Sequence, residues 1–367
     1  MTSIQYPFWK PEVGALELGL VEAVLDSAFL NDGDITQEFE LRLAERLGAR
    51  HVVAVTSGTA AITLALMAAG VGPGHEVLVP DITFIATANA VTLAGAKPVL
   101  VDVDPATLMI DVESAQRQVT GRCRAVIPVH LSGRPADLPG VQTMAAQHGL
   151  VVIEDAAEGF LSRSGPRFLG THGQAGCFSF SPNKTIMTGQ GGAIATDDDD
   201  LHYRLRELKD QGRPARGTGG ADLHVAIGYN FKLTNLQAAV GLAQLSYVDA
   251  RVDRLRDIYR EYCHHLRGVT QIRIFDVRPE EGQTPQWVDV IAERRDELEA
   301  FLLSRGAQCR KFWFPLHTQA PYLAAPDRFP VSSVEGPRAL WLPSAFQLSS
   351  SDIETISRWI REFYEAT

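Results

Sequence analysis

The sequence predicts an α/β protein with a large domain built on a mixed sheet between helices, followed by a smaller C-terminal α+β domain. Apolar, β-branched runs alternate with helical patterns through the first two thirds of the chain. These runs lack polar/apolar alternation, so both faces of the sheet should be covered by helices. The chain has 367 residues, too many for one small core, which favours two domains.

The expected strands are short buried runs. In chain order they are HVVAV (51–55), EVLV (76–79), KPVLV (97–101), RAVIPV (124–129) and LVVIE (150–154), followed by GCFSF and GGAIAT. The segments TAAITLALMAAG, FIATANAVTLAG and VQTMAAQHG between them read as helices, each closing on a glycine suited to a helix end. Four aspartates at 197–200 should open a further helix at its positive end. These aspartates would form a metal site only together with a second group of metal-binding residues. None is evident in the sequence, so no metal is expected.

The second domain should begin near residue 247, which gives a large domain over 1–247 and a small one over 248–367. The small part has its own helices, the short strands IRIF and WVDVIA, and the amphipathic end SDIETISRWIREFY. An N-terminal helix over about 11–29 is expected to bridge the two domains. The glycine-rich, nearly apolar-free stretch 211–226 reads as a long exposed loop, and such loops are often functional.

Charge and composition exclude several classes of function. With 34 basic and 44 acidic residues the net charge is −10, and there is no basic tail, so neither nucleic acid nor an anionic membrane is an expected partner. The N-terminus has no signal-peptide pattern, and the longest weakly polar run is too short for a bilayer. The four cysteines are spaced for neither a metal site nor a disulfide framework. A cytoplasmic protein is therefore expected.

Three segments could carry chemistry. In TSGTAAITLAL a strand ends, a Ser/Gly/Thr turn follows and a helix begins, which gives either an anion site or an ordinary helix cap at Ser57 or Thr59. In VVIEDAAEGF a buried strand runs into Asp155, which is either a site carboxylate or the cap of the next helix. Lys184 precedes a glycine run; it is a nucleophile if partly desolvated and otherwise a solvated turn lysine.

Together the three fit one cofactor. Pyridoxal 5′-phosphate needs a phosphate site, an acid partner for its ring nitrogen and a lysine for its aldehyde. The trio therefore favours this cofactor over three unrelated structural features.

The chain resembles the sugar aminotransferases of the DegT/DnrJ/EryC1/StrS type, which have the aspartate aminotransferase-like fold (fold type I). The resemblance covers nearly the whole chain. It rests on motifs in the family's order: NDGDITQEFE, TSGTAAITLAL, VPDITFIATANAV, AKPVLVDVDP, PVHLSG, IEDAAEG, FSFSPNKTIMTGQGGAIAT, GYNFKLTNLQAAVGLAQL and FPLHTQAPY. The residues of the motifs IEDAAEG and KDQGR are most similar to those of perosamine-synthase-like members.

The resemblance implies roles for individual residues. Lys184 matches the catalytic lysine that bonds to the cofactor, Asp155 the partner of the ring nitrogen, and Glu158 the position that reaches the ring hydroxyl. Cofactor contacts are also implied for a further set: Gly58, Thr59 and Ser179 at the phosphate, Phe84 against the ring face, and Asn230 at the phosphate across a dimer interface. Arg213, in KDQGR, and His317, in FPLHTQ, match regions that line the substrate pocket. His130 in PVHLSG stays open between a site role and a structural one.

The function implied by the resemblance is pyridoxal phosphate-dependent transamination by a homodimer with shared active sites. The expected substrates are a nucleotide-linked 4-keto-6-deoxyhexose and L-glutamate, and the product would be an amino sugar for polysaccharide, glycan or antibiotic biosynthesis. An aminotransferase for a 3-keto sugar or a keto-cyclitol is one alternative. A non-catalytic, cofactor-binding regulatory protein is another, although no DNA-binding module is evident.

Overall fold

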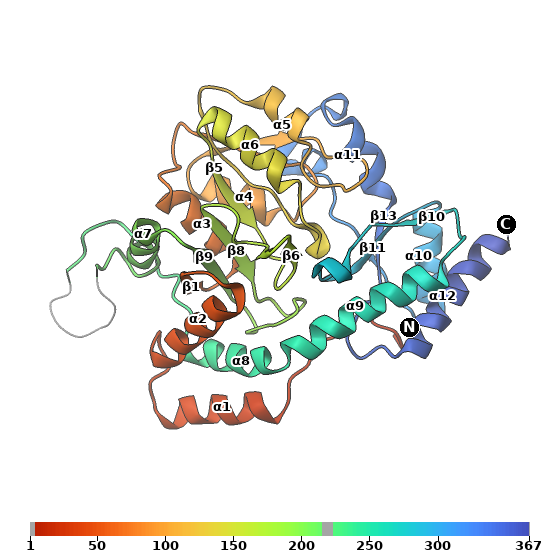
Figure 1. The fold of residues 1–367 in the computed structure, drawn as a ribbon, viewed down its shortest axis with the longest axis horizontal. Coiled ribbons are helices and arrows are strands. Elements are labelled where there is room, and N and C mark those ends of the chain that lie inside the picture. The colour runs from red at the N-terminus through yellow and green to blue at the C-terminus, as the bar shows by residue number, and fades with distance from the viewer. Residues whose placement is uncertain (1–3, 215–222, 367) are drawn as a thin grey trace.

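The computed structural model describes residues 4–214 and 223–366. Its larger part is a sheet of seven strands in the order β1-β9-β8-β5-β4-β2-β3 (Figure 1). The strands are β1 (His51–Val55), β2 (Glu76–Pro80), β3 (Lys97–Val101), β4 (Cys123–Val126), β5 (Val151–Asp155), β8 (Ala175–Ser179) and β9 (Gly192–Thr196). Six run parallel, and β9 is antiparallel to its neighbours β1 and β8. The mixed sheet predicted from the apolar runs is confirmed.

Helices cover both faces of this sheet because alternate strand residues point to opposite sides. Val53 and Val55 pack into a core with α3 (Gly58–Ala68), α4 (Ala86–Leu93) and α7 (Asp199–Lys209). Val52 and Ala54 face the other side, where α2 (Asp34–Leu47) and α8 (Asn235–Ser246) lie. On that side α5 (Val112–Gln118) and α6 (Leu138–His148) cover the far strands.

One strand is shorter than the sequence suggested. The run 124–129 was expected to be extended throughout, but β4 ends at Val126. Pro128 has no N–H to donate to a ladder, so the regular pairing stops before it.

The smaller part is a four-stranded antiparallel sheet in the order β10-β11-β13-β12. Its strands are β10 (Ile272–Ile274), β11 (Val288–Ala292), β12 (Arg310–Lys311) and β13 (Ala339–Leu342). One face packs on α9 (Val248–His265), α10 (Arg295–Ser304) and α12 (Ser350–Glu365). The other face carries Trp287, Trp341 and Phe312 against Val129 and Leu131 of the larger part.

Further short elements complete the described chain: β6 (Arg163–Ser164), β7 (Arg167–Phe168) and α11 (Pro330–Glu335), with 3₁₀ turns at Leu131–Gly133, Pro279–Glu281, Leu316–Thr318, Ala320–Tyr322, Pro326–Arg328 and Gly336–Arg338. No helix within the described ranges is both long and apolar enough to cross a membrane.

The N-terminal segment contacts both parts of the molecule. Gln5 and Tyr6 donate backbone hydrogen bonds to Gly306 in the smaller part. Helix α1 (Ala15–Asp26) then packs along α8 at the lower edge of Figure 1. The helix is shorter than the expected 11–29, because Gly14 has an extended backbone and caps the helix with help from Glu17.

Helix α8 ends at Ser246 and α9 begins at Val248, so the chain passes from the large sheet's helix layer to the small part's helix layer at Tyr247. We propose this joint as the domain boundary. The expected loop 211–226 is described only in part, since residues 215–222 lie outside the described ranges.

Candidate active site

The candidate site is a cavity of about 290 Å³ at the carboxyl ends of β1, β2, β5 and β8. It brings together seven of the residues expected from the sequence, since its lining includes Gly58, Thr59, Phe84, Asp155, Glu158, Ser179 and Lys184. Parallel strands whose ends meet at one edge of a sheet are the usual place for an α/β site, because the loops that follow them converge there.

Lys184 lies in the β8–β9 connection with its side chain only 10% exposed. Its Nζ is 3.6 Å from Glu158 Oε1 and 4.9 Å from the centre of the Trp287 ring. Burial lowers the pKa of Lys184, and the negative charges of Glu158 and Asp155 act against that shift. A lysine with a lowered pKa is more often neutral, and the neutral amine is the form that attacks an aldehyde.

The backbone around Lys184 is held from outside its own loop. Gln286 Oε1 accepts from both the backbone N (3.1 Å) and Oγ1 (2.7 Å) of Thr185, and its Nε2 donates to the Asn183 carbonyl at 3.3 Å. Arg251 donates to the Thr185 carbonyl at 3.1 Å, and Trp9 Nε1 donates to the Pro182 carbonyl at 3.0 Å. The residues on either side of Lys184 are thus fixed by the N-terminal segment, α9 and the loop before β11.

Asp155 is the last residue of β5 and is buried. Its Oδ2 accepts from Thr87 Oγ1 at 2.7 Å, and its Oδ1 accepts from the backbone N of Ala157 at 3.1 Å. Burial raises the pKa of this carboxyl, and these two hydrogen bonds and the charge of Lys184 oppose the rise only in part. Burial makes the negative charge of this carboxyl costly, and a cation beside it would offset that cost. A protonated ring nitrogen of a ligand would therefore be a favourable partner for Asp155.

Glu158 is also buried, and its Oε2 accepts from the backbone N of Ser132 at 2.8 Å. Burial raises the pKa of Glu158, while Lys184 and the hydrogen bond from Ser132 lower it. Ser132 is itself fixed, because its Oγ accepts from Trp341 Nε1 at 2.9 Å and its carbonyl accepts from Gln286 N. Gln286 is therefore hydrogen-bonded to both neighbours of Lys184 in the chain and, through Ser132, is linked to Glu158.

The start of α3 forms the opposite end of the cavity. Ser57 caps the helix by accepting from the backbone N of Ala60 at 3.1 Å. The N–H groups of Gly58 and Thr59, at the start of the helix, have no helical carbonyl to bond. A Cβ at Gly58 would lie 3.0 Å from the Ser179 Cβ, a tight contact, so a glycine here favours the close approach of the turn to β8. The Ser179 hydroxyl is 2.8 Å from that of Ser181. Backbone N–H groups and hydroxyls gathered here suit a phosphate.

The ring of Phe84 is 51% exposed and leans on Trp313, with 4.9 Å between ring centres. An exposed aromatic face in a cavity is a surface on which a flat ring can stack. Pyridoxal 5′-phosphate requires hydrogen-bond donors for its phosphate, an acid for its ring nitrogen and an amine for its aldehyde. The start of α3, Asp155 and Lys184 supply these, and Phe84 offers a face for the ring, so the residues fit the group.

Three predicted residues are placed outside this cavity. Asn230 is exposed and its backbone forms an isolated β-bridge with Asp210, and Arg213 donates to Asp210 Oδ1 at 3.1 Å. His317 is 2% exposed, stacks on Phe329, and its Nδ1 lies 2.6 Å from Asp81 Oδ2. His317 is buried outside the lining of this cavity, and its expected substrate contact stays a prediction.

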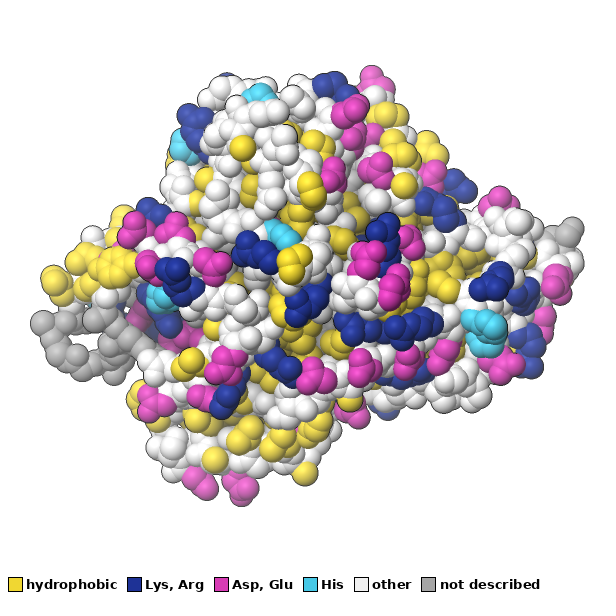
Figure 2. Space-filling view, viewed as in Figure 1, with side chains coloured by type: hydrophobic (Ala, Val, Ile, Leu, Met, Phe, Trp, Pro, Cys, Tyr) yellow, Lys and Arg dark blue, Asp and Glu magenta, His cyan; other side chains and the backbone are white. Residues whose placement is uncertain are grey.

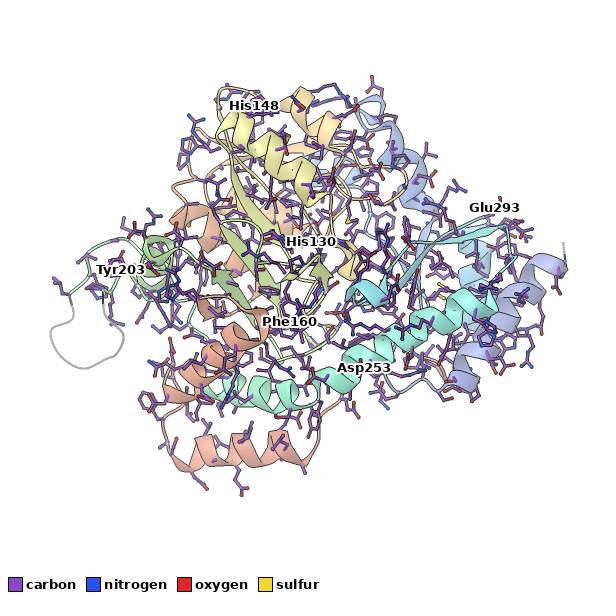
Figure 3. All side chains as sticks on the ribbon, viewed as in Figure 1. His130, His148, Phe160, Tyr203, Asp253 and Glu293 are labelled. Carbon is purple, nitrogen blue, oxygen red and sulfur yellow. The ribbon has the colours of Figure 1, made fainter. Side chains whose placement is uncertain are left out.

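The open question over His130 is answered by its hydrogen bonds. Its Nε2 lies 2.9 Å from Glu154 Oε2, and its Nδ1 accepts from the backbone N of Ala136 at 3.2 Å, so both ring nitrogens are used within the core (Figure 3). His130 is a structural residue here.

Sequence reasoning missed several residues at the cavity. Thr87 holds Asp155, Trp287 lies against the Lys184 amine, and Arg310 and Trp313 form part of the wall. Only the folded arrangement of the C-terminal part brings Trp287, Arg310 and Trp313 to the strand ends, and no motif around them signals it.

Comparisons with known proteins agree with this geometry. The model of the DegT/DnrJ/EryC1/StrS aminotransferase family matches residues 11–361. The chain belongs to this family. It is 34% identical to GDP-perosamine synthase of Escherichia coli O157:H7 over 98% of both chains, and 33% identical to the pleiotropic regulatory protein of Geobacillus stearothermophilus over 99% and 97%. The crystal structure of S. venezuelae DesV in complex with a ketimine intermediate superposes with a TM-score of 0.89 at 33% identity, covering 95% and 94% of the two chains.

Family membership confirms the expected fold type I architecture, the aminotransferase activity and the cofactor. The protein is a pyridoxal 5′-phosphate-dependent aminotransferase. Lys184, Asp155 and the cradle at Gly58 are the residues whose surroundings fit its cofactor.

Proposed function

We propose that the protein transfers the amino group of L-glutamate to a nucleotide-linked keto sugar, with a 4-keto-6-deoxyhexose as the favoured acceptor. The observation that carries the proposal is the buried Lys184 amine beside Glu158, in the cavity that Asp155 also lines, in a chain similar to GDP-perosamine synthase over nearly its full length. The overall exchange is balanced: glutamate becomes 2-oxoglutarate, and the keto carbon becomes an amine-bearing carbon.

The residues divide the work as follows. When bound, pyridoxal 5′-phosphate supplies an aldehyde that carries the amino group and a ring that stabilises negative charge on the reacting carbon. Lys184 would hold the aldehyde between turnovers and move the proton at the reacting carbon once its amine is released. Asp155 would keep a proton on the ring nitrogen, and Glu158 would hold the ring hydroxyl.

The start of α3 would bind the phosphate of the cofactor. The free backbone N–H groups at Gly58 and Thr59 and the Ser179 hydroxyl would hold the phosphate, because a helix start offers both donors and positive potential. Phe84 would cover one face of the ring, which limits the water that reaches it.

The active unit in this proposal is a homodimer with shared sites. Exposed apolar side chains lie on α1 (Leu16, Leu18 and Leu25) and on residues 223–227 (Leu223, Val225 and Ile227). Figure 2 shows apolar side chains along the lower edge and beside the grey residues at the left. Asn230, exposed in the single chain, lies three residues beyond Ile227 and would reach the partner's phosphate. A cytoplasmic location stays a prediction.

The experiment that tests the proposed function is a panel of acceptors with L-glutamate as donor. We expect amination of a nucleotide-linked 4-keto-6-deoxyhexose, detected as a new amino sugar and an equal amount of 2-oxoglutarate. Faster conversion of a 3-keto sugar or keto-cyclitol would replace the favoured substrate with that alternative. No turnover of any acceptor by the cofactor-loaded protein would favour a regulatory role instead.

Subunit mixing tests the shared site. Lys184→Ala and Asn230→Ala proteins should each be impaired, and a mixed dimer should recover activity because one of its two sites is intact. The absence of recovery after verified subunit exchange would refute the contribution of Asn230 across the interface.

A further inference from the structure

An indole ring from the small part of the molecule lies under the amine of Lys184. Trp287 comes directly before β11 and is 1% exposed. The Lys184 Nζ lies over its ring, 4.9 Å from the ring centre. A cation within about 6 Å of the centre of an aromatic ring is attracted by the negative face of that ring, and an indole attracts it most strongly. Trp287 is therefore placed to stabilise the charged form of the amine.

The ring is held in this place by other rings. Its centre lies 5.5 Å from that of Phe8, 4.9 Å from that of Trp341 and 6.5 Å from that of Trp9. The preceding residue, Gln286, is hydrogen-bonded to the residues on either side of Lys184. Packing and hydrogen bonds therefore fix the ring opposite the lysine loop.

The indole N–H of Trp287 indicates which property of tryptophan this position uses. Its Nε1 is buried and has no hydrogen-bond partner among residues 4–214 and 223–366. A buried donor without an acceptor costs free energy, and a phenylalanine here would avoid that cost because its ring has no donor. An indole offers a cation a larger and more attractive face than a benzene ring does. The ring face, rather than the N–H, is therefore the useful part of this side chain.

Charged side chains also act on the amine. Burial lowers the pKa of Lys184, the charges of Glu158 and Asp155 oppose that shift, and the charge of Arg310 adds to it. Under the proposed function, the two carboxylates would face the ring hydroxyl and the ring nitrogen of the cofactor. The face of Trp287 lies outside the cavity lining, so it stays beside the amine when the cavity is filled.

The proposed reaction passes through a state in which this amine is charged. The neutral Lys184 amine takes one proton from the carbon that bears the donor's amino group and becomes an ammonium. It later gives one proton up and returns to its starting state, so no further reactant is needed. Between these two steps the ammonium is held where burial disfavours its charge. A fixed ring face beside the ammonium lowers the free energy of that state.

We propose that Trp287 is a positioning residue, which holds the free amine of Lys184 over its ring face and stabilises the ammonium formed between the two proton movements. The catalytic part of this inference rests on the proposed function, which assigns those proton movements to Lys184. The contact itself involves neither cofactor nor substrate and can be tested without them.

The first measurement uses the cofactor-free protein. The rate at which an amine-directed reagent labels Lys184 is followed against pH by peptide mass mapping, and the midpoint gives the pKa of the amine. The variants are Trp287→Phe, Trp287→Leu and a series with progressively fluorinated tryptophan at position 287, since fluorine withdraws electron density from the ring face and nearly preserves the ring's size. Trp359→Phe is the matched control, because its ring also lies near a cation, Arg305, and outside the cavity lining.

The labelling midpoint should fall by about 0.5–1.5 pH units in Trp287→Leu, because the attraction of the ring face for the ammonium is lost. It should fall by less in Trp287→Phe and step by step along the fluorinated series, while Trp359→Phe matches the wild type. The fluorinated proteins should unfold at the same urea concentration as the wild type, which separates the shift from a loss of packing.

The second measurement uses the cofactor-loaded protein and L-glutamate, without a sugar acceptor. It follows the exchange of the α-hydrogen of glutamate with deuterated water. This exchange should slow by about 2- to 6-fold in Trp287→Leu, because a less basic amine takes up the proton more slowly. The glutamate concentration at half-maximal rate should stay close to the wild-type value, since Trp287 does not line the cavity.

A labelling midpoint that stays constant along the fluorinated series would overturn the inference. A shifted midpoint with exchange as fast as in the wild type would overturn its catalytic part. If Trp287→Leu fails to fold, as judged by circular dichroism, the fluorinated series decides both measurements. A midpoint that shifts along the series, in a protein whose wild type exchanges no hydrogen of glutamate, would refute the proposed function and leave the contact between Trp287 and Lys184 standing.

Discussion

The side chain of Gln286 holds the two residues on either side of Lys184, Asn183 and Thr185, and the loss of these hydrogen bonds can be given an expected free energy. Gln286→Leu keeps the side chain's approximate size and removes three hydrogen bonds, two to Thr185 and one to the Asn183 carbonyl. The backbone N–H and hydroxyl of the buried Thr185 then lose their acceptor. Each orphaned buried group costs about 1–3 kcal/mol, so the free energy of unfolding should fall by roughly 2–6 kcal/mol.

Urea unfolding measures this loss, with the slope of the transition unchanged and the midpoint lowered. Gln283→Leu is the control: Gln283 is also buried but accepts one hydrogen bond, from the Arg278 backbone N, at a place that does not touch the lysine loop. Cofactor attachment at Lys184 should weaken in Gln286→Leu and stay normal in the control. A loss below about 1 kcal/mol in Gln286→Leu would refute the reasoning, because it is less than a single orphaned donor costs.

Three further predictions concern titrating groups. Glu158→Gln removes an anion that raises the pKa of Lys184, so the labelling of Lys184 in the cofactor-free protein by an amine-directed reagent should reach its plateau at a lower pH than in the wild type. Asp155→Asn removes the charge beneath the ring nitrogen and should reduce turnover by at least about 100-fold while the urea midpoint changes little; full activity would contradict the assignment. Burial lowers the pKa of His202 to about 4 from 6.5, so its contribution to stability is present above about pH 6.5 and lost as the pH falls toward 4. His202→Gln should flatten that part of the stability profile, and an unchanged slope would count against it.

The sequence predicted the large sheet well because its strands are covered on both faces. Uninterrupted apolar runs such as HVVAV have few alternatives, and the structure places them as β1 and its neighbours. The end of β4 was set too late because the missing donor of Pro128 is a local effect that an apolar run hides.

The candidate site likewise has residues whose meeting could be predicted from the sequence and residues whose contacts could not. Asp155, Gly58 and Ser179 lie at strand ends or in the turns that follow them, so their meeting follows from a parallel sheet, and Lys184 lies in the loop beyond β8. Gln286, Trp287 and Arg310 come from the C-terminal part, more than 100 residues from Lys184 in sequence. Their contacts depend on how the second sheet packs on the first, and no local pattern encodes that packing.

The surroundings of His317 could not be predicted from its motif either. A histidine in a motif that resembles a substrate region was expected in the pocket, but the nearby Asp81 takes its Nδ1 and Phe329 stacks on its ring. A buried carboxylate needs donors, and this histidine supplies two of them, through its ring and its backbone N.

The central claim is that Lys184 is the amine that bonds to the cofactor. Its most direct test is borohydride reduction of the protein loaded with pyridoxal 5′-phosphate, followed by peptide mass mapping. The account predicts one stable adduct per chain, on Lys184, that is lost in Lys184→Ala and kept in the control Lys232→Ala. An adduct at another lysine, or none, would contradict it.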